Sequence, residues 1–360
     1  MIMADINVKI EETVRVDASA SYDVIIGKGL LENVGEISAK YIAPCRCVLV
    51  TDDIVNSLYA KNVEASLTAS GFEVKKFVIL HGENSKSLEN YAALISFCAE
   101  NALCRSDCLF ALGGGVVGDL TGFVAATYLR GVRFVSLPTT LLAAVDSSVG
   151  GKTAINIPQG KNLVGAFLQP SLVICDYKTL DTLPSYAFSD GYAEIIKYGI
   201  INDREFFDTL KGNINADLGQ IVARCVRNKR DIVMLDERDN AQRQLLNLGH
   251  TVGHAIEKCS SFSISHGHAV AIGIAIVARA GVKIGVCSKD ECDEIISLLN
   301  AYGLPVDCAF SAKQLFECAI SDKKRSKDTF TLIVPYGIGD TRIYKIKEAE
   351  LEAFIASGLV

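Results

Sequence analysis

Four of the five histidines in the chain lie within nineteen residues, at His250, His254, His266 and His268. His250 and His254 are four positions apart, so that on a helix their imidazoles share one face, where they could share a metal ion or flank one. His266 and His268 are two positions apart, so that only one of them is expected to face the same site. A hydrogen bond in the core or at the surface explains any single histidine, but the clustering favours a metal site.

The residues around His250 argue against a zinc peptidase. In the HExxH pattern of those enzymes a glutamate directly follows the first histidine and acts as the general base, whereas Thr251 follows His250 here. Gly249 and Gly253 flank His250 and allow another group to approach the segment closely. Metal-dependent hydrolysis is therefore a weak interpretation of the cluster.

A glycine-rich turn in the first half of the chain predicts a phosphate site. Gly113, Gly115 and Gly118 form a GxGxxG pattern directly after an apolar run at residues 108–112. Small residues at such a turn let backbone N–H groups and the start of the next helix meet a pyrophosphate. The usual fingerprint also has an acidic residue ~20 positions later that holds a ribose, and this chain lacks it. Glycines that serve packing alone therefore remain the alternative.

Charged residues elsewhere in the first half could bind the same ligand or another anion. Asp52 follows one predicted strand, and Glu83 with Lys86 follows another, so a nucleotide laid across several strand ends would meet all of them. The stretch 150–153 resembles the end of a P-loop, but that motif needs a glycine at the position of Asp146, which excludes a kinase or ATPase. The polar residues that remain are Lys152, Lys161 and Asn162, which could hold an anion.

The second half carries charges where charge is costly. Glu194 and Lys197 are three positions apart and share a face of a predicted helix. Lys229 falls on the apolar stripe of a helix predicted at residues 218–233, and an inward lysine needs a partner or a ligand. Arg243 lies on the segment that leads to the histidine cluster, and by itself could be an ordinary surface charge.

The elements that must position these residues change type near residues 175–184. Before that point, short apolar runs alternate with helical stretches, which indicates a parallel sheet covered by helices on both faces. The expected strands are residues 23–26, 47–51, 74–80, 108–112, 134–137 and 172–175. After that point the pattern is mainly helical, with one late strand pair at residues 330–334 and 341–344. We therefore expect a Rossmann-like α/β domain over residues 1–178 and a mainly α-helical domain over residues 179–360.

Length and composition agree with two globular domains. At 360 residues the chain has room for two domains of ~150 residues. Its hydrophobic fraction of 49% excludes a disordered protein, and its net charge of -6 argues against nucleic acid or an anionic membrane as a partner. We find no signal-peptide core and no run of ~20 apolar residues, so we expect a cytoplasmic protein.

The twelve cysteines are many for a chain of this size, but none of them form a CxxC pair. Disulfides are rare in the cytoplasm, and free cysteines behave there as small apolar residues. We therefore expect reduced, mostly buried thiols rather than disulfides or cluster ligands.

Taken in order, these motifs resemble those of the 3-dehydroquinate synthase family of sugar-phosphate cyclases. The matching stretches are residues 113–119, 130–131, 138–143, 145–152, 160–162, 193–194, 247–257 and 266–267. They are long, ordered and spread over nearly the whole chain. The resemblance implies the dehydroquinate synthase-like fold, with an α/β NAD-binding domain followed by a mainly α-helical domain that binds metal and substrate.

The resemblance implies a Zn²⁺ or Co²⁺ ion held by Glu194, His250 and His266, with hydroxyls of the substrate at the open positions. His254 would then act beside the metal in proton transfer or hydrogen bonding. Catalytic roles are implied for Lys152, Lys197, Lys229, His254, Asn247 and Asp146.

The resemblance also implies the residues that bind NAD and substrate. NAD would contact Asp52, Glu83, Lys86, Gly115, Val116, Val117, Gly118, Asp119, Thr139, Thr140, Lys161, Thr179, Leu180, Asp181 and Thr182. The substrate would contact Arg130, Lys152, Asn162, Lys197, Lys229, Arg243 and one of Lys323 or Lys324. In the family, the arginine at position 130 reaches the ligand of the neighbouring subunit, which implies a homodimer.

The implied reaction converts 3-deoxy-D-arabino-heptulosonate 7-phosphate to 3-dehydroquinate and phosphate, in the shikimate pathway to the aromatic amino acids. A metal ion lowers the pKa of a substrate hydroxyl and eases its transient oxidation by NAD. Phosphate then leaves by β-elimination, the carbonyl is reduced again, and ring opening with an intramolecular aldol closure gives the product. The carboxylate and phosphate of this substrate explain a cationic pocket in an acidic protein.

Three positions depart from the family's pattern. His268 stands where the family usually has Glu, Leu248 where an aromatic residue is common, and Ser136 where many relatives have Gln. We expect His268 to face away from the metal, so that no metal ligand is lost.

Three other functions fit part of the pattern. A cyclase that makes 2-deoxy-scyllo-inosose or a valiolone would share the fold, NAD and the metal, but its substrate lacks the carboxylate that Arg243 and Lys229 favour. A metal-dependent alcohol or glycerol dehydrogenase would release NADH, and the set of cations argues against it. A non-enzymatic NAD-sensing protein would be expected to lack Lys152, Glu194 or His250, and all three are present.

Overall fold

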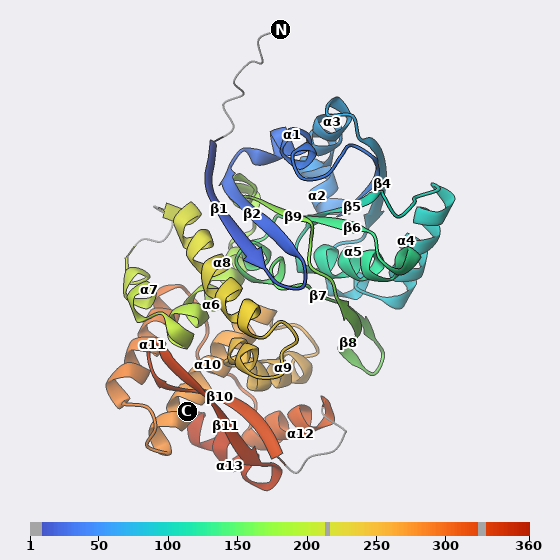
Figure 1. The fold of residues 1–360 in the computed structure, drawn as a ribbon. Helices are drawn as coiled ribbons and strands as arrows, with labels where there is room; N and C mark the ends of the chain where they lie inside the picture. Colours follow the sequence, from blue (N-terminus) through green and yellow to red (C-terminus); the bar gives the residue numbers. More distant parts are fainter. Residues whose placement is uncertain (1–8, 213–216, 323–328) are drawn as a thin grey trace. The chain divides into compact units, whose positions relative to one another are not determined.

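The computed structural model describes residues 9–212, 217–322 and 329–360 of the chain. By contacts it divides into two compact units, whose elements are labelled in Figure 1. Unit 1 contains Met1–Leu183 and Leu218–Arg230, and unit 2 contains Pro184–Asp217 and Asp231–Val360. The first part of helix α8 (Leu218–Leu235) thus belongs to unit 1.

Unit 1 is built on a seven-stranded sheet in the order β1-β2-β9-β6-β5-β3-β4. Neighbouring strands are parallel, except that β1 and β2 are antiparallel. The strands are β1 (Lys9–Asp17), β2 (Ser21–Lys28), β3 (Arg46–Asp52), β4 (Glu73–Ile79), β5 (Cys108–Gly113), β6 (Arg133–Pro138) and β9 (Leu172–Asp176). All six strands expected from the sequence are present, and β1 adds an edge that the sequence analysis did not include.

Helices cover both faces of this sheet. They are α1 (Val34–Ala39), α2 (Asp53–Val55), α3 (Lys61–Ala69), α4 (Leu88–Glu100) and α5 (Gly115–Thr127), with short turns η1 (Leu30–Asn33), η2 (Asn56–Ala60), η3 (Glu83–Ser85), η4 (Tyr128–Arg130), η5 (Ala143–Ser147) and η6 (Tyr177–Thr182). Alternate residues of a strand face opposite sides, so Leu49 packs in one core with α1 and α3, and Val48 in the other with α4 and α5. Because both faces are buried, the strands read as continuous apolar runs.

A separate antiparallel hairpin of β7 (Lys152–Ile157) and β8 (Gly160–Phe167) packs on α5 in unit 1. The sequence analysis did not predict this hairpin. It matters for function because it carries three predicted anion-binding residues, Lys152, Lys161 and Asn162.

Unit 2 is mainly helical, as expected. Its elements are α6 (Ser185–Asn202), α7 (Arg204–Thr209), η8 (Gln242–Asn247), α9 (His250–Cys259), α10 (His266–Lys283), α11 (Lys289–Ala301), α12 (Ala312–Asp322), α13 (Glu348–Gly358) and the hairpin β10 (Thr329–Gly337) with β11 (Asp340–Lys347). The hairpin confirms the late strand pair. Within the described residues, no helix combines the length and the apolar character needed to span a bilayer.

Helix α10 forms the centre of unit 2, where it packs against α6, α9, α11 and α13. Its contact with α9 is close, because a Cβ on Gly273 would lie 2.1 Å from the carbonyl oxygen of Gly249. Gly249 also has a φ of 77°, a left-handed conformation that suits glycine at the start of α9. The tight packing brings the first residues of the two helices, His250 and His266, into one region.

The expectation that every cysteine is reduced is wrong for one pair. Cys259, at the end of α9, forms a disulfide with Cys318 of α12, and their Cα atoms lie 6.3 Å apart. The two residues are 59 positions apart in the sequence, so their spacing carried no signal. The other ten cysteines are free. Seven of them are buried, as expected, whereas Cys45 and Cys308 are half-buried and Cys104 is exposed.

Candidate functional site

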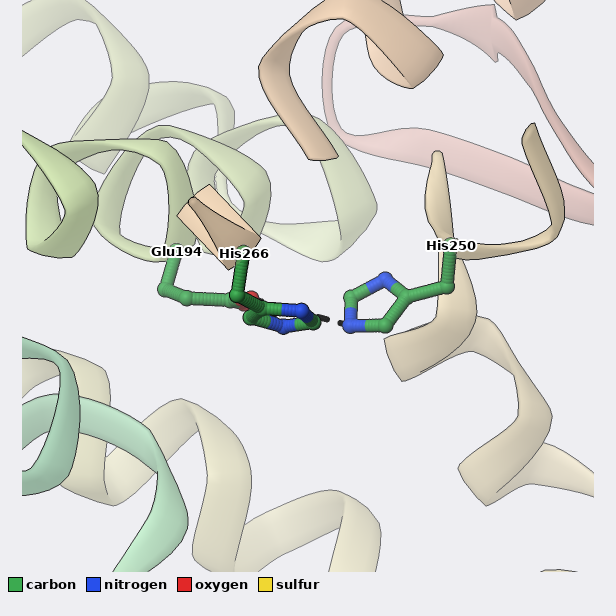
Figure 2. Close-up of side chains that lie close together, drawn as sticks. All are labelled: Glu194, His250 and His266. Carbon is green, nitrogen blue, oxygen red and sulfur yellow. Dashed lines mark ion pairs between the residues drawn. The ribbon is translucent and has the colours of Figure 1, made fainter. Parts of the chain in front are cut away.

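Three side chains from three helices of unit 2 converge on one point (Figure 2). Glu194 comes from α6, while His250 and His266 are the first residues of α9 and α10. One oxygen of Glu194 lies 3.6 Å from His250 Nε2 and 3.5 Å from His266 Nε2. One ligand atom from each residue lies within 4.8 Å of the others. The structure thus brings together the three residues that the resemblance implied as metal ligands.

Both imidazoles are held so that Nε2 faces Glu194. His250 Nδ1 lies 3.0 Å from the carbonyl oxygen of Leu248, which can only accept a hydrogen bond. His266 Nδ1 lies 3.3 Å from Glu257 Oε2. A protein that uses Nε2 as a metal ligand usually fixes the ring by a hydrogen bond at the other nitrogen, in this way.

The carboxylate of the cluster is buried, and the two imidazoles are half-buried. Glu194 and Lys197 are each 1% exposed, and their side chains form an ion pair. Burial lowers the pKa of His250 to about 3, so this ring is neutral at pH 7. Burial also acts to lower the pKa of His266, but hydrogen bonds to Glu194 and Glu257 raise it to about 10. Two imidazole nitrogens and one carboxylate are a donor set that fits Zn²⁺ or Co²⁺ and leaves room for further ligands.

The two remaining histidines of the cluster lie in different surroundings. His254 is exposed, and its ring centre lies 5.5 Å from that of His250. It belongs to a second group of potential ligands with Glu257 and His266. His268 instead contacts Asp190, with Nδ1 2.7 Å from Asp190 Oδ1. The expectation that only one of His266 and His268 faces the Glu194 cluster agrees with this arrangement.

The glycine-rich turn between β5 and α5 lines a pocket of unit 1, the β5–α5 pocket, together with residues of β6, η5 and β7. Backbone packing is tight at its base, where a Cβ on Gly113 would lie 2.6 Å from Val117. Gly118 faces open space, since a Cβ there would meet nothing within 4 Å. The lining includes Gly113, Gly114, Gly118, Asp119, Ser136, Ser147, Lys152 and Thr153. Gly114, Gly118 and Asp119 thus place the start of helix α5 at the pocket, as a phosphate site requires.

Charged residues cluster beside this turn. Lys86 is 5% exposed and forms an ion pair with Asp119, and its ammonium also donates to Asn162 Oδ1 at 2.5 Å. Burial raises the pKa of Asp119, although Lys86 acts in the opposite direction. Glu83 accepts a hydrogen bond from Asn156 and lies 3.7 Å from the ammonium of Lys161. The structure therefore joins four of the predicted NAD-binding residues, Glu83, Lys86, Asp119 and Lys161, with the predicted substrate residue Asn162.

Other predicted NAD-binding residues have local structural roles in unit 1. Asp52 caps α2 by accepting from the backbone N–H of Val55, and burial raises its pKa. Thr140 Oγ1 accepts from the N–H of Ala143, whereas the buried Thr139 hydroxyl has no hydrogen-bond partner among the described residues. The turn η6 holds Thr179, Leu180, Asp181 and Thr182, while Val116 and Val117 lie in the first turn of α5.

Two of the predicted catalytic residues, Lys229 and Asp146, are in contact in unit 1. Lys229 is 6% exposed, and its ammonium donates to the carbonyl oxygen of Asp146 at 2.7 Å and lies 3.1 Å from its carboxylate. This pairing explains how a lysine can lie on an apolar stripe. Lys152 is exposed at the start of β7 and lines the pocket. Arg130 is exposed at the end of η4, with a φ of 67°.

The remaining predicted residues of unit 2 lie on the segment before α9. Arg243 is 1% exposed, and its guanidinium donates to the carbonyl oxygen of Glu237 at 2.5 Å. Asn247 ends η8 and is half-buried. The predicted residues Lys323 and Lys324 lie outside the described residues. Sequence reasoning missed Glu257, although its position three residues after His254 on the same helix was a usable signal.

Comparison with known proteins places this geometry in a family. Residues 76–190 match the family described as 3-dehydroquinate synthase N-terminal, and residues 191–325 match 3-dehydroquinate synthase C-terminal. The chain is 42% identical over 356 residues to 3-dehydroquinate synthase of Desulforamulus reducens, which covers 96% of this chain and 99% of the relative. It is 45% identical over 330 residues to the 3-dehydroquinate synthase of Pseudoalteromonas atlantica, covering 89% and 92%.

Solved structures show the same fold in related cyclases. The 2-epi-5-epi-valiolone synthase of Streptomyces hygroscopicus subsp. jinggangensis, solved with NAD⁺ and Zn²⁺ bound, is 26% identical with a TM-score of 0.85, covering 96% of this chain and 98% of that one. A 2-deoxy-scyllo-inosose synthase superposes with a TM-score of 0.87 at 24% identity, and a glycerol dehydrogenase from Schizosaccharomyces pombe with 0.63 at 15%, so these two share the fold. The sequence matches go further than the fold: the chain belongs to the 3-dehydroquinate synthase family.

Proposed function

We propose that Glu194, His250 and His266 hold the catalytic metal ion, and that the β5–α5 pocket binds NAD, in the reaction of the family. In that reaction the chain converts 3-deoxy-D-arabino-heptulosonate 7-phosphate to 3-dehydroquinate and phosphate. The observation that carries the residue assignment is a buried carboxylate and two oriented imidazoles, converging in a chain 42% identical to a 3-dehydroquinate synthase over 96% of its length. The valiolone synthase solved with NAD⁺ and Zn²⁺ supports the same two cofactors here.

The side chains around the metal ligands prepare them for binding. Glu257 and the carbonyl of Leu248 accept the Nδ1 protons, so that Nε2 of each ligand imidazole can bind a cation. Lys197 balances the charge of the buried Glu194. When bound, the metal ion polarises a substrate hydroxyl and lowers its pKa. His254 is exposed beside the ligand rings, where it can hold or move a proton of the substrate.

The β5–α5 pocket is suited to the pyrophosphate of NAD. The first turn of α5 directs backbone N–H groups toward it, and Gly118 leaves the approach open. Lys86 and Lys161 supply positive charge at its side, while Asp52 caps a helix that follows a neighbouring strand. When bound, NAD takes up a hydride and returns it later, so the reaction has no net redox change.

Cationic side chains in both units are suited to an anionic sugar phosphate. Lys152 is exposed in the pocket of unit 1, and Lys229 is held by Asp146. Arg243 is buried in unit 2, near Asn247 in the sequence, whose amide makes no hydrogen bond with the described residues. We assign these groups to the phosphate, carboxylate and hydroxyls of the substrate.

One assay tests the proposal against its alternatives. The protein is incubated with the heptulosonate phosphate, Zn²⁺ and a catalytic amount of NAD⁺. It should release one phosphate for each substrate molecule consumed, without net absorbance from NADH. Accumulation of NADH would indicate a dehydrogenase, and turnover of a carboxylate-free sugar phosphate alone would indicate another cyclase. Removal of the metal by a chelator should abolish activity, and added Zn²⁺ or Co²⁺ should restore it.

We also propose that the protein is a cytoplasmic homodimer in which Arg130 of one subunit reaches the substrate of the other. Arg130 is exposed on a backbone turn with three successive positive φ values, at Leu129, Arg130 and Gly131. Mixed dimers of Arg130→Ala and Lys152→Ala subunits should regain part of the activity that each variant lacks, because one of the two sites is then intact. Two inactive variants that never complement each other would contradict the shared site.

A further inference from the structure

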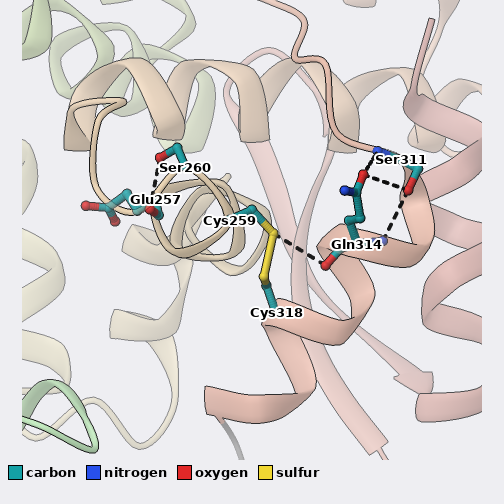
Figure 3. Close-up of a disulfide and its surroundings, with 6 residues drawn as sticks. All are labelled: Glu257, Cys259, Ser260, Ser311, Gln314 and Cys318. Atoms are coloured by element: carbon teal, nitrogen blue, oxygen red, sulfur yellow. Dashed lines mark hydrogen bonds between the residues drawn. A yellow bond between two sulfur atoms is a disulfide. The ribbon is translucent and has the colours of Figure 1, made fainter.

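The disulfide of unit 2 differs in its surroundings from most cysteines of the chain. Burial raises the pKa of Cys98 and Cys175 to about 12 and that of Cys287 to about 11, so these thiols stay protonated and react slowly. Cys259 and Cys318 are both partly exposed. Figure 3 shows the disulfide that joins them. A thiol reagent in solution can therefore reach this pair, whereas the buried thiols are shielded.

The structure also offers a partner for the reduced form. The carbonyl oxygen of Gln314 on α12 lies 3.4 Å from Cys259 Sγ (Figure 3). A thiol at Cys259 would have this acceptor in place, so the pair can open without leaving a buried donor unsatisfied. Both the oxidised and the reduced state are thus compatible with the packing of α9 against α12.

The disulfide lies at the end of α9, close in the sequence to a residue that holds one of the proposed metal ligands. Cys259 follows Glu257, which holds the ring of His266, by two residues. The connection from α9 to α10 then passes through Ser261 and Phe262, whose φ values of 51° and 62° are unfavourable for residues other than glycine. At its far end, the hydroxyl of Ser265 donates to Asp190 at 2.6 Å. The disulfide anchors one end of this strained connection, and the hydrogen bond anchors the other.

We propose that Cys259 and Cys318 form a reversible redox site, and that its disulfide strengthens metal binding by fixing the end of α9. In reduction, a thiolate of a small dithiol or of glutathione attacks one sulfur, and a second thiolate resolves the mixed disulfide. Two electrons and two protons pass to the pair, the S–S bond breaks, and the reductant becomes the disulfide. With the anchor open, the connection relaxes and Glu257 holds His266 less firmly. The effect on the metal rests on the proposed metal site, but the redox chemistry does not.

The first experiment measures the redox site without reference to metal or activity. The full-length protein is equilibrated in glutathione buffers of increasing GSSG to GSH ratio, and free thiols are labelled and located by mass spectrometry. Cys259 and Cys318 should become protected together at one midpoint, while Cys308, a half-exposed free cysteine of the same unit, should stay labelled throughout. Labelling of both Cys259 and Cys318 at every ratio would overturn the proposal.

The second experiment connects the redox state with the metal. Zn²⁺ affinity is measured by competition with a chromogenic chelator for oxidised protein, reduced protein, the double variant Cys259→Ser/Cys318→Ser and the control Cys308→Ser. Reduced protein and the double variant should bind Zn²⁺ about 10-fold more weakly than oxidised protein, at the lower end of the change seen when a ligand's hydrogen-bond partner is disturbed. In the control Cys308→Ser, the Zn²⁺ affinity should still fall when the protein is reduced. Equal affinity of oxidised and reduced protein would overturn the coupling, whereas absence of Zn²⁺ binding in every form would instead refute the proposed metal site.

Discussion

The β5–α5 turn of unit 1 and the Glu194 cluster of unit 2 are built by different means. The turn depends on the absence of side chains, since Gly118 leaves a space in which a Cβ would meet nothing within 4 Å. The cluster depends on its side chains, since three charged or titratable groups converge and each is held by another group. A site made of backbone and space should be damaged by added atoms, and a site made of side chains should be damaged by lost ones.

The largest expected effect is the loss of a ligand from the Glu194 cluster. His250→Ala removes one of the three donors, so Zn²⁺ affinity should fall by more than the ~100-fold that loss of a supporting hydrogen bond causes at most. Activity should fall with it. Lys152→Ala is the matched comparison, because Lys152 lies on β7 in unit 1 and belongs to no metal-binding group of the described residues. It should keep the metal and weaken substrate binding; equal loss of metal in both variants, measured by elemental analysis, would contradict the assignment.

The next effect is expected at the turn, where an added side chain should do harm. Gly118→Val fills the open space, so NAD affinity should fall ~5- to 150-fold, as ~1–3 kcal/mol of overpacking predicts. The folded protein should be no less stable, since a Cβ at position 118 would meet no atom within 4 Å and glycine is the weaker helix former. Gly113→Ala is the converse, because its Cβ would lie 2.6 Å from Val117 and should lower the melting temperature. Calorimetric titration with NAD⁺ and thermal unfolding separate the two outcomes, and a Gly118→Val protein with unchanged NAD affinity would place NAD elsewhere.

A loss of affinity of similar size should follow when the hydrogen-bond partner of a metal ligand is changed but the ligand itself stays. Glu257→Gln keeps the shape of the side chain but weakens the acceptor for His266 Nδ1, so Zn²⁺ affinity should fall about 10- to 100-fold. His268→Gln is the control, since His268 lies two residues from His266 but contacts Asp190. Its metal affinity should stay close to that of the unchanged protein. If both variants lose metal equally, general disturbance of α10 explains the result better than the Glu257 contact.

The same contrast explains how much could be predicted from the sequence. The central strands were predicted because burial on both faces leaves continuous apolar runs, as in residues 108–112 of β5. The turn was predicted because its glycines stand at a fixed spacing directly after an apolar run. The convergence of Glu194 with His250 and His266 was implied by resemblance to a family, since spacing could pair only His250 and His254.

What the sequence did not reveal depends on contacts between different helices and strands. Strand β1 is mostly exposed and polar, and it forms only because β2 offers it a sheet edge. Glu257 gained its role from the ring of His266, which reaches it from the next helix. The pairing of Cys259 with Cys318 follows from the packing of α9 on α12. Of these contacts, the disulfide left no local signal because its cysteines are 59 positions apart, whereas Glu257 could have been found from its spacing to His254.

The smallest effect would distinguish a hydroxyl that binds NAD from one that is merely buried. Thr139 and Thr121 each have a buried Oγ1 without a hydrogen-bond partner among the described residues, but only Thr139 directly follows a strand, β6, which neighbours β5. Thr139→Val should lower NAD affinity ~2- to 12-fold, the value of one hydrogen bond of ~0.5–1.5 kcal/mol. Thr121→Val, within α5, should leave NAD affinity unchanged. Both variants should be at least as stable as the parent without NAD, because valine has the same shape and no hydroxyl to desolvate. A Thr139→Val protein that binds NAD normally would show that the Thr139 hydroxyl does not contact the cofactor.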